Sequence, residues 1–175
     1  MNKAELRQLI RSKSDALSGE YIKASGQLIA KKFIASSVFQ ESENIFIYVS
    51  TAKEPDTLGI IEAALASGKK VYVPKCGRNH TMKAIRINST DELKSGYMGI
   101  PEPVGDEEAE NIDLAVIPCI SASTDGKRLG HGAGFYDRFL AETDTKKVCL
   151  CFGRLLCDDI PMEKFDIKMD CVISE

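Results

Sequence analysis

The sequence has no apolar run that approaches the ~20 residues of a membrane-spanning helix. Residues 1–13 are charged and lack the apolar stretch of a signal peptide, so no export signal is expected. The six cysteines form no Cys-x-x-Cys pair, which argues against a zinc site. Cys149 and Cys151, two residues apart in an apolar run, are expected to be buried free thiols on one face of a strand. These features favour a protein of the reducing cytoplasm with no membrane partner.

A basic excess is also missing, because 23 Lys and Arg residues face 26 Asp and Glu residues, for a formal net charge of −3. Nucleic-acid-binding proteins usually carry such an excess, so nucleic acid is not an expected partner. Small anionic ligands are compatible with this balance, since local clusters of charge decide their binding. The length of 175 residues and the 43% of hydrophobic residues predict one domain, residues 1–175, with its own core. A monomer is expected.

Apolar periodicity predicts two helices within residues 1–36, with Ser18 as the N-cap of the second. Their inward faces are predicted to carry the apolar residues of each segment: Leu6, Leu9 and Ile10 in the first, and Tyr21, Ala24, Leu28 and Phe33 in the second. A third helix is predicted at 58–67, between the start signal Pro55-Asp56-Thr57 and the stop residue Gly68. A short fourth helix is predicted at 135–141.

Short apolar runs rich in β-branched residues predict strands at 45–49, 71–74, 82–87, 114–118, 148–152 and 171–173. Strand, helix and strand over residues 45–74 make a βαβ unit, which requires parallel strands. The predicted fold is therefore α/β: a three-layer α/β/α arrangement with an open, mainly parallel, Rossmann-like sheet. Such folds bind ligands beyond the carboxyl ends of the strands, where residues 50–56 and 119–137 lie. Residues 88–111, rich in Gly, Pro and acids, are predicted to be a surface excursion.

Glycines alternate with other residues in the stretch Gly130-His131-Gly132-Ala133-Gly134. Glycines let backbone N–H groups approach a phosphate closely, and the cations Lys127, Arg128 and Arg138 surround this loop. Asp137 is an oxygen ligand of the kind that Mg²⁺ takes in phosphate sites. The spacing matches neither the Walker loop nor the dinucleotide fingerprint, and a flexible turn with a solvated charged rim is the alternative interpretation.

The stretch from Arg128 to Asp137 resembles the signature of the 5-formyltetrahydrofolate cyclo-ligase family, R-L-G-x-G-x-G-[FY]-Y-D. Further elements of that family follow in collinear order: Lys3, Leu6 and Arg7; Ser50, Glu54, Asp56 and Thr57; Gly68-Lys69-Lys70-Val71-Tyr72-Val73-Pro74; Gly99-Ile100-Pro101-Glu102-Pro103; and Asp170-Cys171-Val172-Ile173. Each element is weak by itself, whereas the ordered set is specific and covers nearly the whole chain.

The resemblance implies an ATP- and Mg²⁺-dependent enzyme that cyclises 5-formyltetrahydrofolate to 5,10-methenyltetrahydrofolate and releases ADP and phosphate. It implies that ATP is bound by two segments: Lys3, Ala4, Glu5, Leu6 and Arg7, and then Arg128, Leu129, Gly130, His131, Gly132, Ala133, Gly134, Phe135 and Tyr136. It also implies that the folate is bound by Val49, Glu54, His131, Gly132, Ala133, Gly134 and Phe135. The Mg²⁺ ligands would be Asp137 and Asp170, and the catalytic residues Arg128, Tyr136 and Glu54.

Several of these residues have a plainer alternative role. Lys3 and Arg7 are also compatible with a solvated helix face, and Glu54 with an acid that leads a helix and is stabilised by its dipole. Asp170 is equally compatible with a surface acid at a strand edge, and Tyr136 with an aromatic residue of the core.

The chain departs from the family pattern, which before the glycine loop is usually P-G-x-A-F-D-x-x-G. Here Cys119 replaces the glycine, and Ala122-Ser123 replaces the Phe-Asp pair. Arg154 replaces a usual Gln, and Phe165 a usual His. These departures leave three alternatives open: a paralogue that acts on another substrate, a sugar-phosphate isomerase-like enzyme, and a non-catalytic nucleotide- or folate-binding module.

Overall fold

The computed structural model describes residues 1–96 and 99–175. Its helices are α1 (Lys3–Asp15), α2 (Gly19–Ile34), α3 (Ser37–Glu41), α4 (Leu58–Ala66) and α5 (Phe135–Ala141). The strands of the main sheet are β1 (Asn44–Ile47), β2 (Lys70–Cys76), β3 (Met82–Ile87), β6 (Leu114–Ile117), β9 (Lys146–Leu150) and β10 (Cys171–Ile173). Two short antiparallel pairs lie outside this sheet: β4 (Leu93–Ser95) with β5 (Pro101–Pro103), and β7 (Ser121–Ala122) with β8 (Arg128–Leu129).

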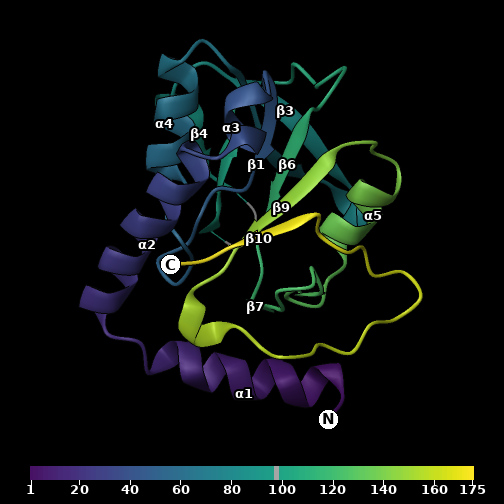
Figure 1. Ribbon diagram of the computed structural model, residues 1–175. Coiled ribbons are helices and arrows are strands. Elements are labelled where there is room, and N and C mark those ends of the chain that lie inside the picture. The colour runs from purple at the N-terminus through teal and green to yellow at the C-terminus, as the bar shows by residue number, and fades with distance from the viewer. Residues whose placement is uncertain (97–98) are drawn as a thin grey trace.

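The main sheet formed by the described residues has the strand order β10-β9-β6-β1-β2-β3 (Figure 1). Neighbouring strands from β10 to β2 are parallel, and β3 at the edge is antiparallel to β2. Numbered along the chain, the order is 6-5-4-1-2-3, which is the Rossmann arrangement. The predicted α/β class and the mainly parallel, Rossmann-like sheet are therefore confirmed.

Helices cover both faces of the sheet. Figure 1 shows α2, α3 and α4 grouped on one side and α5 on the other. The Phe46 ring in β1 lies 4.6 Å from the Phe139 ring of α5, measured between ring centroids. Ile45 and Ile47 point to the opposite face because side chains alternate along a strand. All three β1 side chains are buried, so β1 lies in the core between the two layers of helices.

The β1–α4–β2 unit forms as the sequence predicts. Ile45 of β1 lies opposite Val71 of the parallel β2. Thr57 is the N-cap residue of α4. The helix ends before Gly68, whose φ of +77° is a left-handed conformation that glycine adopts without steric cost. The start and stop signals of this helix are therefore both confirmed.

The inward face of α1 differs by one residue from the predicted face. Leu6 and Ile10 are buried as predicted, whereas Leu9 is 42% exposed. A residue next to the buried stripe is rotated by about 100° around the helix, which is enough to turn it toward solvent. At the start of α2, the Ser18 hydroxyl accepts a hydrogen bond from the Tyr21 amide at 3.1 Å, so the predicted N-cap is confirmed.

The prediction for α2 was wrong at two positions. Phe33 is buried as expected, but Ala24 is exposed and Leu28 is 51% exposed. The buried stripe passes through Ser25 and Gly26 instead. A search for large apolar residues overlooks such a stripe, because here the small size of the residues lets the helix approach its neighbours.

The helix α3 and the short strands β4, β5, β7 and β8 were not predicted. The short helix α3 follows α2 directly, with the Ser36 hydroxyl as its N-cap. Within the predicted excursion of residues 88–111, β4 and β5 pair, and the Glu102 carboxylate accepts a hydrogen bond from the Cys76 amide of β2 at 2.9 Å. This part of the chain is therefore attached to β2 of the main sheet. Residues 97 and 98 lie outside the described residues.

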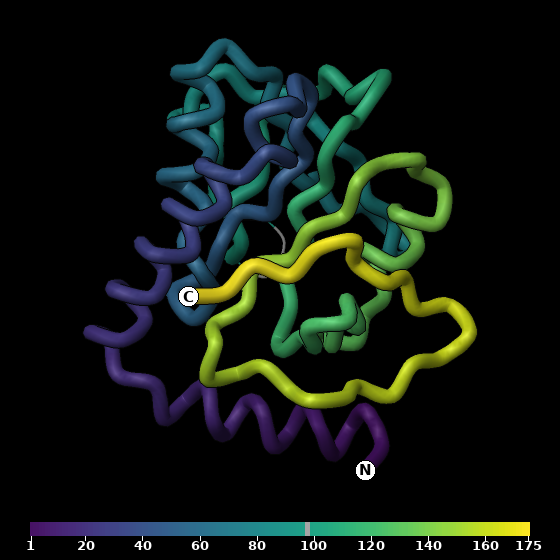
Figure 2. The backbone as a smooth tube through the Cα atoms, in the orientation of Figure 1, coloured from purple at the N-terminus to yellow at the C-terminus, as the bar shows by residue number. Residues whose placement is uncertain are grey.

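Helix α1 lies across the carboxyl ends of the strands rather than on a face of the sheet. Figure 2 shows it at the bottom of the view, with the C-terminal segment 156–170 running alongside. Lys3 of α1 forms ion pairs with Asp166 and Glu163 of that segment. The 3-10 turn Gly153–Leu155 also packs on α1. Together α1 and the C-terminal segment cover the strand ends.

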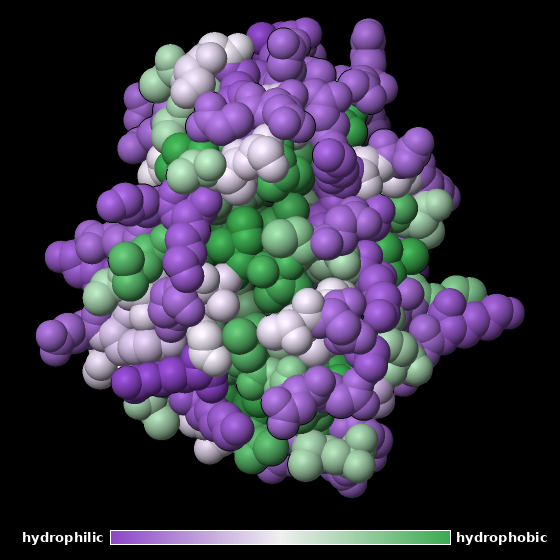
Figure 3. All heavy atoms as spheres, in the orientation of Figure 1, coloured by the Kyte–Doolittle hydropathy of each residue, from purple (hydrophilic) through white to green (hydrophobic). Residues whose placement is uncertain are grey.

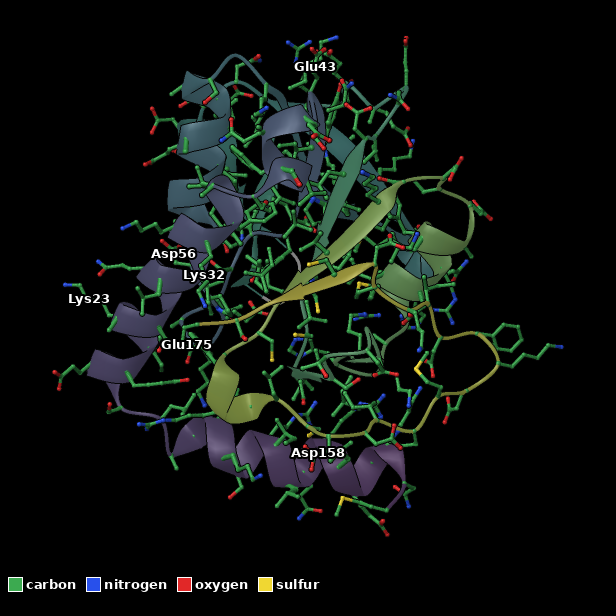
Figure 4. The ribbon with its side chains drawn as sticks, viewed as in Figure 1. Lys23, Lys32, Glu43, Asp56, Asp158 and Glu175 are labelled. Atoms are coloured by element: carbon green, nitrogen blue, oxygen red, sulfur yellow. The ribbon has the colours of Figure 1, made fainter. Side chains whose placement is uncertain are left out.

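The end of the chain is fixed to α2, on whose side Figure 4 shows Glu175. The Glu175 carboxylate accepts hydrogen bonds from the Tyr21 hydroxyl and, at 2.9 Å, from the Gly153 amide. Burial and the hydrogen bond to Glu175 raise the pKa of Tyr21. Arg154 stacks on the same ring, with its guanidinium carbon 4.3 Å from the ring centroid. This gives Arg154, a departure from the family pattern, a structural role.

Figure 3 shows an apolar area in the middle of the face on which β10 lies, with hydrophilic residues around it. Val172 and Ile173 of β10 are half-buried and pack against the core. The six cysteines are free, and Cys149 and Cys151 are buried as predicted. In the part of the chain that the structure describes, no helix has both the length and the apolar character to cross a membrane.

Asp113, just before β6, ties the starts of β1 and β6 together. Its Oδ2 accepts hydrogen bonds from the amides of Glu43 at 2.9 Å and Asn44 at 2.7 Å, and from the Asn44 side chain at 3.1 Å. The Asn111 side chain donates to Oδ1 at 2.9 Å. Burial opposes the charge of Asp113, but these hydrogen bonds outweigh burial and lower the pKa of this carboxyl.

We expect Asp113→Ala to lower the free energy of unfolding at neutral pH by about 1.5–3 kcal/mol, the usual contribution of hydrogen bonds to a charged group. A carboxyl whose folded pKa is lowered stabilises the fold above its unfolded pKa, about 3.9, and loses that effect as the pH falls through the folded pKa. Urea unfolding at decreasing pH should therefore show the two proteins converging. Asp106→Ala, at an exposed acid, is the control. A gap that persists in strong acid would contradict the role of the charge.

Candidate active site

The strand order reverses at the carboxyl ends of β1 and β6, because the chain places β2 on one side of β1 and β6 on the other. Open α/β sheets bind ligands in the crevice at such a reversal. The two segments predicted to hold ligands, residues 50–56 and 119–137, leave β1 and β6 at this point. The fold therefore brings both predicted segments to one crevice.

The segment after β1 is closed into a turn by side-chain hydrogen bonds. The Thr57 hydroxyl donates to the Tyr48 carbonyl at 2.7 Å and accepts from the Ser50 amide at 3.0 Å. The Tyr48 hydroxyl donates to the Pro55 carbonyl at 3.0 Å. This turn holds Glu54 at the crevice.

Glu54 is the residue at which the two segments meet. Its Oε2 accepts a hydrogen bond from the Thr51 amide at 2.7 Å, and its Oε1 lies 3.4 Å from Nε2 of His131. Burial opposes the ionisation of Glu54, but the hydrogen bonds from His131 and Thr51 outweigh burial and lower the pKa. The side chain is only 11% exposed, so the crevice holds an ionised, mostly buried carboxylate.

The β7–β8 pair leads the chain into the glycine loop, with Ala122 opposite Arg128. At the turn between these strands, Gly126 has a φ of +90°. A Cβ at this position would lie 2.2 Å from the Met169 carbonyl oxygen, so only glycine fits. The close contact with the C-terminal segment helps to place Arg128 beneath the loop.

Arg128 is a buried cation, 6% exposed. Its Nη1 donates to the Pro118 carbonyl at 3.1 Å, and its Nη2 lies 2.9 and 2.8 Å from the two oxygens of Asp137. Its Nε is buried and has no hydrogen-bond partner within the described residues. A Cβ on Gly130 would lie 2.8 Å from Nη1, so the loop rests directly on this guanidinium group.

Three further arginines hold the loop by its carbonyl groups. From α1, Arg7 Nε donates to the Gly130 carbonyl at 2.8 Å, and Arg11 Nη2 lies 3.5 Å from the His131 carbonyl oxygen. From α5, Arg138 Nη1 donates to the Ala133 carbonyl at 2.9 Å. Guanidinium groups from α1 and from α5 therefore surround the loop.

The backbone N–H groups of the loop differ from its carbonyl groups in their contacts. Across residues 1–96 and 99–175, the N–H groups of residues 131–133 have no hydrogen-bond acceptor. Gly132 has a φ of +107°, and a Cβ there would lie 3.5 Å from Cζ of Arg7. Exposed amides among guanidinium groups are suited to an anion such as a phosphate group.

The predicted α1 segment divides by role. Arg7 reaches the loop, whereas the Lys3 ammonium pairs with Asp166 and Glu163. Glu5 forms a capping box with Asn2, which stabilises the start of the helix. Ala4 is exposed, and Leu6 is a core residue, 7% exposed.

Other predicted residues are also packing residues. Val49 and Leu129 are buried in the core, so neither side chain faces an open site. The Tyr136 ring lies 6.4 Å from the Phe46 ring, and burial raises the pKa of Tyr136, which keeps it neutral. The Phe135 ring of the loop lies 5.0 Å from the His80 ring, between centroids.

Two pockets lie on either side of the turn that carries Glu54. The first has a volume of about 510 Å³ and is lined by Glu54, His131 and Arg11 and by the buried residues Cys119, Ile120, Cys151, Phe152 and Leu155. The second, of about 960 Å³, lies between this turn and α2 and includes Lys23, Gln27 and Lys31. Glu54 lines both. The first pocket combines an apolar wall with an ionic rim beside the glycine loop.

The two predicted metal ligands have separate cationic partners. Asp137 pairs with Arg128 and is 23% exposed, whereas Asp170 accepts a hydrogen bond from the Lys147 amide at 2.7 Å at the start of β10. No group of three metal-ligating side chains is found among the described residues. Mg²⁺ bound with phosphates needs only one or two carboxylates, so Asp137, next to the loop, fits such an ion. Asp170, before rather than beyond its strand, does not fit the same crevice, and its metal role stays a prediction.

Sequence reasoning missed Arg11, Asp166 and His80. Arg11 could have been found, because Lys3, Arg7 and Arg11 are spaced by four residues and so lie on one helix face. Asp166 and His80 carry no local signal, since each meets its partner only through the fold.

These features define a Rossmann-like α/β protein that places, at the strand reversal, a glycine loop suited to an anion beside an apolar pocket. The chain belongs to the 5-formyltetrahydrofolate cyclo-ligase family, whose profile matches residues 1–175. The resemblance seen in the sequence is thereby confirmed.

Individual relatives agree with this assignment. The chain is 34% identical over 190 residues to a probable 5-formyltetrahydrofolate cyclo-ligase of Caenorhabditis elegans, covering 99% of this chain and 92% of the relative. It is 31% identical over 189 residues to the 5-formyltetrahydrofolate cyclo-ligase of Mus musculus, covering 99% and 91%. The NMR structure of Aquifex aeolicus 5,10-methenyltetrahydrofolate synthetase is similar with a TM-score of 0.88 and 26% identity, covering 99% of this chain and 89% of that one.

We expect Gly132→Val to raise the dissociation constant of ATP by about tenfold or more, a loss of ~1.4 kcal/mol in binding. A branched side chain fits neither the positive φ of Gly132 nor close contact between the loop amides and phosphate. Gly68→Val is the matched control, because Gly68 also has a positive φ but lies far along the chain, in open space. Both variants should lose about 1–3 kcal/mol of stability through strain. Calorimetric titration showing equal ATP affinity in both would exclude the loop as a phosphate site.

Proposed function

We propose that the protein is an ATP-dependent 5-formyltetrahydrofolate cyclo-ligase that converts 5-formyltetrahydrofolate to 5,10-methenyltetrahydrofolate. The observation that carries this proposal is the glycine loop held by guanidinium groups beside a pocket with an ionised Glu54, in a chain of this family. The enzyme acts as one domain, as a monomer and in the cytoplasm, on two small molecules.

The triphosphate of ATP lies on the glycine loop. The N–H groups of residues 131–133 donate to its oxygens, and Arg7, Arg11 and Arg138 supply positive charge around them. Arg128 supports the loop from below, and its charge is shared with Asp137. Lys3 joins this site only if it leaves Asp166, so its contribution to ATP binding is the smaller one.

The folate lies in the first pocket, with its ring against the apolar wall formed by Ile120, Phe152 and Leu155. The Glu54 carboxylate accepts N–H groups of the pterin, for which an ionised acid is the better acceptor. His131 joins both sites, because its side chain meets Glu54 and its backbone belongs to the loop. The two substrates are therefore held against each other along the line from Glu54 to the loop.

Formyl activation follows from this juxtaposition. The formyl oxygen attacks the γ-phosphorus of ATP, and ADP leaves. The ten-position nitrogen of the folate then attacks the activated formyl carbon, the ring closes, and phosphate departs. The protein performs little covalent chemistry, so positioning and charge neutralisation provide the rate enhancement. Glu54 orients the folate, and the loop amides with their arginines stabilise charge on the transferred phosphoryl group.

Mg²⁺ supplies additional positive charge on the phosphate oxygens when it is bound with ATP. Asp137 is the carboxylate placed to hold it, at the first turn of α5 beside the loop. Its pairing with Arg128 fixes the direction of this carboxylate. Asp170 is assigned no part in this site.

The alternatives differ in what they consume. A sugar-phosphate isomerase-like enzyme needs no ATP, a paralogue transfers the phosphoryl group of ATP to another acceptor, and a binding module shows no turnover. The mostly buried Glu54 at the wall of an apolar pocket favours a flat, nitrogen-rich ligand over a small sugar phosphate.

We expect the purified protein, given Mg²⁺, ATP and 5-formyltetrahydrofolate, to form 5,10-methenyltetrahydrofolate and ADP in equal amounts. The methenyl product is followed by its absorbance and ADP by a coupled assay. Omission of either substrate is the control. Hydrolysis of ATP without cyclised product would contradict the folate assignment and favour the paralogue.

We expect Asp137→Asn to lower turnover by about 10–100-fold and to raise the Mg²⁺ concentration needed for half of the maximal rate. Asparagine keeps the size of the side chain and an oxygen for Arg128, so the fold should persist with some loss of stability. Asp144→Asn, at an exposed acid in the loop after α5, is the control. A variant that lost stability but kept the wild-type dependence on Mg²⁺ would leave Asp137 with its structural role only.

A further inference from the structure

Three of the six cysteines gather at the carboxyl ends of β6 and β9. The register pairs Ile117 of β6 with Cys149 of β9 in parallel strands. Continued by two residues, that register places Cys119 beside Cys151. Neighbouring parallel strands are about 4.8 Å apart, and disulfides form between Cα atoms about 4.4–6.8 Å apart.

The side chains agree with this placement. The Cys119 thiol lies close enough to the thiols of Cys149 and Cys151 for each to influence the ionisation of the others. Its sulfur also lies 3.4 Å from the Leu150 carbonyl oxygen, between those two residues. The strand register and this contact therefore place Cys119 next to Cys151 across neighbouring strand ends.

Only two of the three thiols face the first pocket. Cys119 and Cys151 line it, whereas Cys149 is fully buried and does not. Their own exposures are small, 8% for Cys119 and 2% for Cys151. A small, uncharged reagent that enters the pocket can therefore reach this pair, while bulky reagents meet mainly Cys171, which is exposed.

The surroundings favour the reactive form of Cys119. Hydrogen bonds from Cys149 and Cys151 outweigh burial, and with the nearby charge of Arg128 they lower the pKa of the Cys119 thiol. The pKa values of Cys149 and Cys151 are raised by their hydrogen bonds to Cys119 and by burial. A thiol with two others beside it is the arrangement that an attacking sulfur and a resolving sulfur need.

We propose that Cys119 and Cys151 form a reversible oxidation site, at which a peroxide converts the two pocket thiols to a disulfide. The Cys119 thiolate attacks one oxygen of hydrogen peroxide, the O–O bond breaks, and with one proton the other oxygen leaves as water. The Cys151 sulfur then attacks the resulting sulfenic acid, the S–S bond forms, and a second water leaves. Two thiols are oxidised, and one peroxide is reduced to two waters.

This site is a property of this chain rather than of the family signature, because Cys119 stands where that pattern has glycine. The structure gives the cluster no metal-binding role, since the described residues include no group of three ligands suited to a metal ion. Because the disulfide would cross the wall of the first pocket, oxidation would link the redox state to occupancy of that pocket. The oxidation itself is independent of the proposed function.

The test is mass spectrometry of the native, reduced protein after exposure to hydrogen peroxide. The wild type should lose the mass of two hydrogens and regain it with dithiothreitol. Alkylation under denaturing conditions should leave Cys119 and Cys151 unlabelled in the oxidised sample. A tryptic fragment of residues 148–154 contains both Cys149 and Cys151, so fragmentation within it must assign the link to Cys151. Phenylarsine oxide, which bridges two close thiols, should block the reaction.

Variants separate this pair from the other thiols. Cys119→Ala should abolish the loss of two hydrogens, while Cys171→Ser should react as the wild type does. If Cys119→Ala fails to fold, the assignment of the link in the wild type decides the question alone. Oxidation of Cys171 without a Cys119 link would overturn the proposal. A link from Cys119 to Cys149 would overturn the pairing.

Discussion

The buried guanidinium group of Arg128 is the constraint on which the site depends. Removing a cation from water costs several kcal/mol unless hydrogen bonds and an opposite charge compensate. The Pro118 carbonyl and the Asp137 carboxylate provide that compensation, and Asp137 also accepts a hydrogen bond from the Ile167 amide at 3.2 Å. One side chain therefore joins the end of β6, the start of α5 and the C-terminal segment. Loss of the Asp137 carboxylate would leave the buried charge of Arg128 unpaired, which explains why the glycine loop is held in one place.

The position of α1 determines how charge is distributed around that loop. Its basic residues are spaced by four, but the fold gives them different partners: Lys3 is neutralised by the C-terminal segment, whereas Arg7 and Arg11 hold loop carbonyls. Because the carbonyl groups of the loop face the arginines, its N–H groups are available to donate to an anion. The strand reversal then places an apolar pocket directly next to this anion site, with Glu54 between them. The glycine loop and the apolar pocket thus share one border.

Much of the fold could be predicted from local pattern. The βαβ unit follows from apolar runs and the stop at Gly68, and the bounds of α5 were predicted without error. Prediction failed where packing depends on small size rather than hydrophobicity, as at Ser25 and Gly26 in α2. It failed also where a short element is stabilised by its neighbours, as in α3, because no short-range signal marks such an element.

The sequence by itself determined the class of fold, the family and the two segments that meet at the crevice. These depend on periodicity and motifs, which are local properties of the chain. Only the tertiary structure decided which charged groups already have partners: Asp137 with Arg128, Lys3 with Asp166, and the Glu54 carboxylate with the His131 ring. It also decided that Leu6 and Leu129 pack in the core although they belong to the binding motifs. Pairing and burial arise between residues far apart in sequence, and the cost of an unpaired buried charge selects among partners that sequence alone treats as equal.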